Sequence, residues 1–223
     1  MPGDGFHPPL EEYLESIHAL EEEGVSVIQA RLSERLGHSA QSVSEMVHRL
    51  ESEGYLERAG RGVVKLTPAG RRRAESVVRK HRLAERFLVE IVGLEWHKAH
   101  LEAGRWEHVI SDDVEARFVD LLGNPSTCPH GNPIPGAPPV TDVQQPLADA
   151  EQGARVTLAR ITEQVEIDLG ALEYLSDHGL LPGTGATVRT RAPDGTLILE
   201  LDRDGSSVAL GPAISRQLYV VAT

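Results

Sequence analysis

Several histidine and glutamate residues in the middle of the 223-residue chain stand at spacings that suit a metal ion. His81 and Glu85 are four residues apart, so on a helix both side chains project from one face. His100, Glu107 and His108 share a face of the next predicted helix. Imidazole and carboxylate donors suit divalent ions such as Mn, Fe, Co, Ni or Zn. The pattern predicts a divalent-metal site, although a lone histidine is more often a surface or hydrogen-bonded core residue.

Three carboxylates on the first predicted helix, Glu11, Glu12 and Glu15, form an acidic cluster. Glu12 could close a metal site against Glu107 and His108. Helix polarity alone also explains acidic residues in a first turn, so both explanations stay open.

Helices are the elements expected to position these side chains. Apolar residues recurring at helical spacing predict a helix over about 9–23. Thr67 as N-cap, followed by Pro68, predicts a long helix that lasts until about Val92. Two further helices are expected, at 96–109 and 112–122.

Between the first and the long helix, the sequence predicts two short helices and a hairpin. Ser26 has capping-box spacing for a helix that stops at Gly37, and Ser39 or Ser42 can cap the next one. Two β-prone runs around 59–62 indicate a hairpin. This order forms a winged helix-turn-helix, whose second helix enters the major groove of DNA while the wing contacts the backbone. A plain helical hairpin with a loop is the alternative.

Small polar side chains begin the third predicted helix, and they let a helix N-terminus approach bases and phosphates closely. The candidates for reading bases are Gln41, Ser42 and Glu45, with Ser39 and Ser44 beside them. The side chains expected to contact phosphates are Arg31, Arg49, Arg58, Arg61 and Lys65.

The distribution of charge supports a nucleic-acid partner despite a net charge of -12. Residues 26–90 hold 13 Lys and Arg against 8 Asp and Glu, a net charge of +5. A solvated charged face would also explain this count. No apolar run approaches membrane-spanning length and the N-terminus lacks signal-peptide features, so we expect a cytoplasmic protein.

The sequence after residue 123 changes character. A Pro- and Gly-rich stretch over 124–150 indicates a linker, and short alternating runs after it predict a small β-barrel with a helical insert near 168–178. The chain is therefore expected to be mainly α with a small β domain. Cys128, the only cysteine, excludes an intramolecular disulfide and is interpreted as a bystander, because nothing in the sequence lowers its pKa.

Three motifs resemble the diphtheria toxin repressor family of iron- and manganese-dependent repressors: VVRKHRLAERFL (77–88), AGRWEHVISDDVE (103–115) and HGNPIPG (130–136). The resemblance is strong from about residue 10 to 136 and weak through the barrel, which looks like that family's SH3-like domain. It implies a metal-activated repressor that binds double-stranded, palindromic operator DNA as a homodimer and controls metal-uptake genes.

With this resemblance, four segments are expected. They are a winged helix-turn-helix domain over 1–73, a helical metal-binding and dimerisation domain over 74–123, a linker over 124–150 and an SH3-like barrel over 151–223.

The resemblance also implies two metal sites. His81, Glu85 and His100 match one of them, to which the family's barrel domain adds a ligand. Glu166 is the first candidate for that ligand and Asp168 the second.

Glu107 and His108 match the second, activating site. There the iron-dependent members have a Met on the first helix and a Cys three residues before the Glu, whereas this chain has Glu12 and Gly104. The candidates for the missing ligand are Glu15, Glu102, a carbonyl oxygen or water.

Loss of two sulfur donors and gain of a carboxylate harden the activating site, which favours manganese. In this respect the chain resembles the manganese transport regulators, and iron is the alternative. A hydrolase is disfavoured because the chain has no H-E-x-x-H or nucleophile motif, so we expect no enzyme and no small organic substrate. Since no apolar run is long enough to span a membrane, we also expect no membrane partner. A metal-independent winged-helix regulator stays open and would bind DNA equally with or without chelator.

Overall fold

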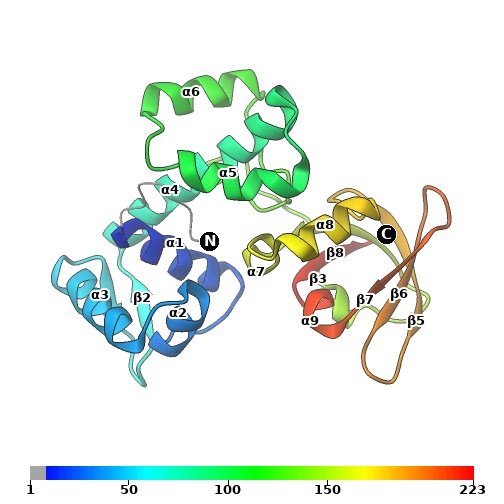
Figure 1. Ribbon diagram of the computed structural model, residues 1–223, viewed down its shortest axis with the longest axis horizontal. Helices are drawn as coiled ribbons and strands as arrows, with labels where there is room; N and C mark the ends of the chain where they lie inside the picture. Colours follow the sequence, from blue (N-terminus) through cyan, green and yellow to red (C-terminus); the bar gives the residue numbers. More distant parts are fainter. Residues whose placement is uncertain (1–8) are drawn as a thin grey trace. The chain divides into compact units, whose positions relative to one another are not determined.

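The computed structural model describes residues 9–223, which form two compact units (Figure 1). The first unit comprises the described residues up to His81 together with Gly104–Glu115, and the second comprises Arg82–Ala103 and Ala116–Thr223. The boundary passes through one long helix, between His81 and Arg82.

Three helices open the first unit: α1 (Pro9–Glu22), α2 (Gln29–Leu36) and α3 (Ala40–Ser52). Ser39 caps α3, since its Oγ accepts a hydrogen bond of 3.1 Å from the Ser42 backbone N–H. The predicted Ser26 cap is wrong, because α2 begins after Ile28, which has no side-chain oxygen to offer. Gly37 ends α2 at φ +66°, a left-handed conformation that glycine adopts readily.

The predicted wing is confirmed as an antiparallel hairpin of β1 (Leu56–Arg58) and β2 (Val64–Leu66). Arg61 lies at its tip with φ +50°, between two glycines that also have positive φ. A single core of buried side chains joins α1, α2, α3 and the hairpin, so α3 and the wing belong to one packed body. Its largest fully buried members are Tyr13, Leu14, Ile17, Leu32 and Leu50.

Helix α4 (Pro68–Phe87) begins as the sequence predicts, with Thr67 Oγ1 accepting a hydrogen bond of 3.1 Å from the Gly70 N–H. It continues as a π-helical segment, Leu88–Val92, and stops at Gly93. The helix expected at 96–109 is shorter than predicted: a 3-10 turn at Trp96–Lys98 leads into α5 (Ala99–Trp106). Helix α6 (Asp112–Leu121) follows.

Six antiparallel strands form the sheet of the second unit, in the order β3-β8-β4-β5-β6-β7 (Figure 1). They span Gln145–Pro146 (β3), Arg155–Ile161 (β4), Gly185–Arg191 (β5), Leu197–Leu201 (β6), Ser207–Leu210 (β7) and Leu218–Ala222 (β8). The helical pieces are a 3-10 turn at Leu147–Asp149, α7 (Glu163–Glu166), α8 (Leu169–Asp177) and α9 (Pro212–Ser215).

Buried residues alternate along these strands and pack with Leu172 and Leu175 of α8 into the core of the second unit. The expected class, mainly α with a small β domain, is confirmed. None of the helices within residues 9–223 is both long and apolar enough to cross a membrane.

The Pro- and Gly-rich segment contains a buried stretch. The His130 carbonyl accepts a hydrogen bond of 2.9 Å from the Ile161 N–H, and Asn132 Nδ2 donates one of 2.8 Å to the Ile161 carbonyl. At Gly131, a Cβ would lie 2.1 Å from the Ala159 carbonyl oxygen, so only glycine allows this approach to β4. These contacts bring the neighbours of Gly131 to the end of β4.

Candidate functional site

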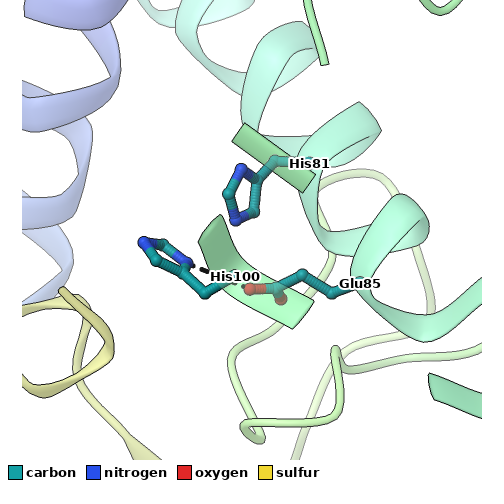
Figure 2. A group of neighbouring side chains, drawn as sticks. All are labelled: His81, Glu85 and His100. Atoms are coloured by element: carbon teal, nitrogen blue, oxygen red, sulfur yellow. Dashed lines mark hydrogen bonds and ion pairs between the residues drawn. The ribbon is translucent and has the colours of Figure 1, made fainter. Parts of the chain in front are cut away.

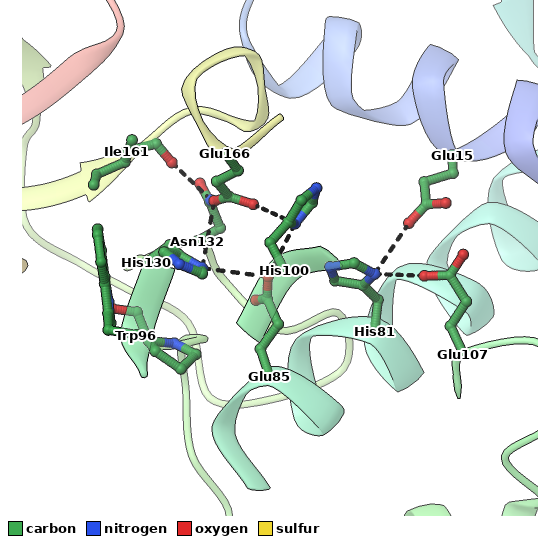
Figure 3. Close-up of polar contacts among 11 residues, drawn as sticks. Glu15, His81, Glu85, Trp96, His100, Glu107, His130, Asn132, Ile161 and Glu166 are labelled. Atoms are coloured by element: carbon green, nitrogen blue, oxygen red, sulfur yellow. Dashed lines mark hydrogen bonds and ion pairs between the residues drawn. The ribbon is translucent and has the colours of Figure 1, made fainter. Parts of the chain in front are cut away.

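Five titratable side chains of the first unit form what we call the first cluster: Glu11, Glu15, His81, Glu107 and His108. His81 Nδ1 lies 2.5 Å from Glu107 Oε2 and 4.0 Å from Glu15 Oε1 (Figure 3). His108 Nδ1 lies 2.7 Å from Glu11 Oε2, and its Nε2 lies 3.0 Å from Glu107 Oε1. Glu107 therefore stands between two imidazole rings.

Three separate elements supply the first cluster. Glu11 and Glu15 are one turn apart on α1, His81 comes from α4, and Glu107 and His108 follow the end of α5. Residues four apart on a helix share a face, which is why both α1 carboxylates reach the cluster.

Burial and charge act in opposite directions on the first cluster. The Glu107 side chain is only 3% exposed, and burial alone would raise its pKa, but the neighbouring His81 and His108 lower the pKa to about 2. Burial would lower the pKa of His108, yet Glu107 and Glu11 raise it. The cluster thus favours an ionised carboxylate with positive charge beside it. Since the ligand atoms of Glu15, His81 and Glu107 lie within 4.8 Å of one another, a divalent cation fits this donor set.

The helix-one carboxylate expected at this site was Glu12, but the contacts are made by Glu11 and Glu15. Glu12 is half-buried and belongs to none of the three-ligand groups among residues 9–223, and neither does Glu102. Glu12 precedes Glu15 by three residues, so the two are neighbours on the surface of α1 and Glu12 stays a candidate ligand. Gly104 faces the cluster, because a Cβ there would lie 4.0 Å from His81 Cε1.

Five side chains of the second unit form what we call the second cluster: Glu85, His100, Cys128, His130 and Glu166. His100 Nδ1 lies 3.1 Å from Glu85 Oε1 (Figure 2) and 3.0 Å from Glu166 Oε2 (Figure 3). His130 Nδ1 lies 3.2 Å from Glu85 Oε1. Glu85 and His130 are completely buried.

Cys128 and His130 are the members of the second cluster that sequence reasoning missed. Together with Glu85 they place three ligand atoms within 4.8 Å. Burial and the nearby Glu85 and Glu166 raise the pKa of the Cys128 thiol, while Glu85 and Glu166 raise the pKa of His130 against the effect of its burial. This position makes Cys128 a candidate ligand, whereas the sequence was interpreted as leaving it a bystander. The available signal was the Cys-Pro-His spacing, which puts two metal-ligand types two residues apart.

The second cluster also contains a buried imidazole nitrogen that lacks a hydrogen bond among the described residues. His130 Nε2 is buried and has no hydrogen-bond partner within residues 9–223. A buried imidazole nitrogen without a partner is uncommon, and a bound cation is one way to satisfy it. Cysteine, imidazole and carboxylate donors together suit a divalent transition metal.

The barrel-domain candidates differ in position. Glu166 joins the second cluster, where Asn132 Nδ2 donates a hydrogen bond to its Oε1. Asp168 is exposed and caps α8, its Oδ1 accepting a hydrogen bond of 3.1 Å from the Ala171 N–H. His81 and Glu85 lie one turn apart on α4 but belong to different units, so their shared site with His100 stays a prediction.

The DNA-reading candidates lie on the surface of the first unit. All are exposed except Ser44, which is half-buried. Gln41 Nε2 donates a hydrogen bond of 3.0 Å to Glu45 Oε1, and Arg49 and Arg58 form ion pairs of 2.7 Å with Glu53 and Glu51. The paired arginines must exchange these partners to contact phosphate. Three remaining basic side chains are exposed: Arg31 on α2, Arg61 at the wing tip and Lys65 on β2.

Comparison with known protein families assigns each part of the chain. Residues 6–64 match the iron dependent repressor N-terminal DNA binding domain, and residues 67–136 match the iron dependent repressor metal binding and dimerisation domain. Residues 145–222 match the FeoA domain.

Individual relatives agree with this assignment. The iron-dependent repressor IdeR of Mycobacterium tuberculosis is 44% identical over 200 residues, which cover 85% of this chain and 87% of that protein. The diphtheria toxin repressor of Corynebacterium diphtheriae is 39% identical over 209 residues, covering 90% and 91%. A solved manganese-dependent transcriptional repressor in complex with manganese has a TM-score of 0.86 at 34% identity, covering 96% of this chain and all of that one. The chain thus belongs to the diphtheria toxin repressor family of metal-dependent transcriptional repressors.

Proposed function

We propose that manganese activates this repressor at the first cluster, and that the loaded protein binds operator DNA as a homodimer and controls metal-uptake genes. The observation that carries this proposal is the donor chemistry of the first cluster. Its donors are carboxylate oxygens and imidazole nitrogens, and Gly104 contributes no side-chain donor at all. Hard oxygen-rich donor sets favour Mn over softer ions.

The proposed ligands of this ion are Glu15, His81, Glu107 and His108. Glu12, predicted from the family pattern, remains a further candidate because it lies on α1 between Glu11 and Glu15. When bound, the ion supplies positive charge that compensates carboxylates from α1 and from the end of α5. The residues themselves then tie α1, which shares a core with α2 and α3, to α4.

Iron is the second candidate metal, and sequence identity favours it. IdeR, whose name describes it as iron-dependent, is 44% identical to this chain, whereas the manganese-bound neighbour is 34% identical. The donor set argues the other way, and we give it more weight because selectivity depends on ligand hardness and geometry.

The second cluster is proposed to hold another divalent ion through Glu85, Cys128, His130 and Glu166, with His100 beside them. A thiolate donor softens this site compared with the first cluster. The two clusters should therefore differ in metal preference, and the first one should decide activation by manganese.

DNA recognition is assigned to the N-terminal end of α3 and to the wing. The exposed Gln41, Ser42 and Glu45 are proposed to contact bases, while Arg61 and Lys65 contact phosphates. Exposed apolar side chains on the helices of the second unit, including Leu101 (48%) and Leu121 (62%), support association with a second copy.

The experiment is a titration of operator binding against Mn, Fe and Zn, with chelator as the metal-free reference. Metal must tighten DNA binding, and DNA must tighten metal binding by the same factor. His81→Ala should abolish the response to manganese and His100→Ala should only weaken it. His178→Ala, at a half-buried histidine of the second unit that belongs to neither cluster, is the matched control. Equal operator affinity with and without chelator would overturn the proposal.

A further inference from the structure

We propose that Glu11 is a positioning residue for the metal site: it accepts a hydrogen bond from His108 Nδ1 and so holds His108 Nε2 ready to bind a metal ion. This inference rests on the proposed function of the first cluster. Glu11 belongs to none of the three-ligand groups within residues 9–223, and its two carboxylate oxygens already have protein partners.

The geometry of His108 carries the argument. A neutral imidazole has one N–H donor and one acceptor nitrogen, and the hydrogen bond made by one nitrogen determines which form is present. His108 Nδ1 lies 2.7 Å from Glu11 Oε2, a distance that suits an N–H donor to a carboxylate. Binding of a metal ion at Nε2 requires this form, with the remaining proton on Nδ1 facing Glu11. Nε2 itself lies 3.0 Å from Glu107 Oε1, so Glu107 is the carboxylate that competes with Glu11 for the ring proton.

Both side chains of the contact between His108 and Glu11 are largely buried. The His108 side chain is 1% exposed and that of Glu11 is 13% exposed, so water cannot readily replace the carboxylate. Carboxylates that accept from the second nitrogen of a metal-binding histidine orient the ring and raise its basicity. Glu11 is placed to do both.

Arg73 of α4 holds the other end of Glu11. Arg73 Nη2 lies 2.6 Å from Glu11 Oε1, so one carboxylate connects α4, α1 and the histidine that follows α5. This ion pair restricts the rotamers of Glu11 and keeps Oε2 directed at His108. The alternative is that Glu11 only links α1 to α4 through this ion pair and does not orient His108.

A second ion pair in the same unit provides the control. Arg71 of α4 lies 2.6 Å from Glu21 of α1, and the two arginines are 46% and 48% exposed. Glu21 pairs with no histidine in the described structure; its other contact is a long hydrogen bond of 3.5 Å from the Leu66 N–H. Removing Glu21 breaks an equivalent α1–α4 tie without touching the metal site.

The first test needs no metal. Nitrogen-15 NMR of His108 in the metal-free protein, at a pH where the ring is neutral, should show the proton on Nδ1. Glu11→Ala should shift the population toward the Nε2–H form, and Glu21→Ala should leave it unchanged. An Nε2–H ring in the parent protein, or no change in Glu11→Ala, would overturn the proposal.

The second test measures Mn²⁺ affinity by electron paramagnetic resonance of the free ion. Glu11→Ala should weaken binding about 10- to 100-fold, the effect typical of such supporting partners, while Glu21→Ala stays within about twofold. Glu11→Gln keeps an acceptor oxygen without the charge, so its Mn²⁺ affinity should lie between those of Glu11→Ala and Glu21→Ala. Thermal unfolding should show a loss of stability for both alanine variants, larger for Glu11→Ala because it also removes the buried contact with His108.

His108→Ala separates the two possible failures. If it leaves Mn²⁺ affinity unchanged, the proposed metal site is wrong. If it weakens binding but Glu11→Ala behaves like Glu21→Ala, the metal site stands and the positioning role of Glu11 is refuted.

Discussion

Gly104 is the position where this chain departs most from the sulfur-containing site of iron-dependent members, and the structure predicts what a side chain there would do. Gly104 is part of α5, and a Cβ added to it would meet His81 Cε1 at 4.0 Å, an ordinary van der Waals contact. An alanine therefore fits without displacing its neighbours. Its methyl group carries no metal-binding atom.

The magnitude follows from helix propensity. Glycine inside a helix is less favourable than alanine by about 1 kcal/mol, and less near the end of a short helix such as α5. Gly104→Ala should thus stabilise the metal-free protein by about 0.5–1 kcal/mol, which raises Tm by roughly 1–4 °C for a chain of this size. Gly70→Ala is the contrast, because its Cβ would lie 2.1 Å from the Tyr55 carbonyl oxygen and should destabilise by about 1–3 kcal/mol.

The assay combines thermal unfolding with metal titration. Gly104→Ala should keep the parent's Mn²⁺ affinity, whereas Gly104→Cys places a thiolate near His81 and should shift the ranking toward Fe, Co and Ni. Thiolate binding to Co²⁺ is visible as a charge-transfer absorption band. Combining Gly104→Cys with Glu12→Met should enlarge the shift. A lower Tm for Gly104→Ala, or an unchanged metal ranking for Gly104→Cys, would refute this account of the site.

Arg61→Ala should weaken binding to all DNA about equally and reduce the slope of log affinity against log salt concentration by about one, whereas Gln41→Ala should reduce the free-energy difference between operator and random DNA by about 1 kcal/mol or more. Fluorescence anisotropy at several salt concentrations measures both effects. A change of sequence preference alone in Arg61→Ala would contradict the wing assignment. The lowered pKa of Glu107 contributes stability to the metal-free protein that is lost as the pH falls from 4.5 toward about 2, so the urea midpoint of Glu107→Gln should drop less than the parent's on acidification. The raised pKa of His108 means that Mn²⁺ must displace a proton, so Mn²⁺ affinity should rise with pH through that pKa; a flat profile would exclude His108 as a ligand. Cys128→Ala should weaken metal binding at the second cluster and leave manganese activation nearly intact, as measured by metal stoichiometry and operator binding.

Local patterns in the sequence were sufficient for most of the fold. Apolar spacing identified α1, the Thr67–Pro68 pair marked the start of α4, and turn residues marked the wing. These features depend on residues within one or two turns of each other, where propensity and capping act directly. Two helices were exceptions: α2 begins after Ile28 and lacks the predicted Ser26 cap, and α5 is shorter than the helix expected at 96–109.

Which side chains meet in each cluster depended instead on the tertiary structure. Sequence spacing indicated that helix one would supply a carboxylate but not that Glu11 and Glu15 would make the contacts, because the rotation of α1 about its axis is set by packing of its apolar face. Cys128 and His130 lie in a segment without periodicity, so only the close approach of Gly131 to β4 revealed that they meet Glu85. Spacing reports which residues share an element, whereas a site built from several elements requires the directions in which their side chains point, and those come from the packed core.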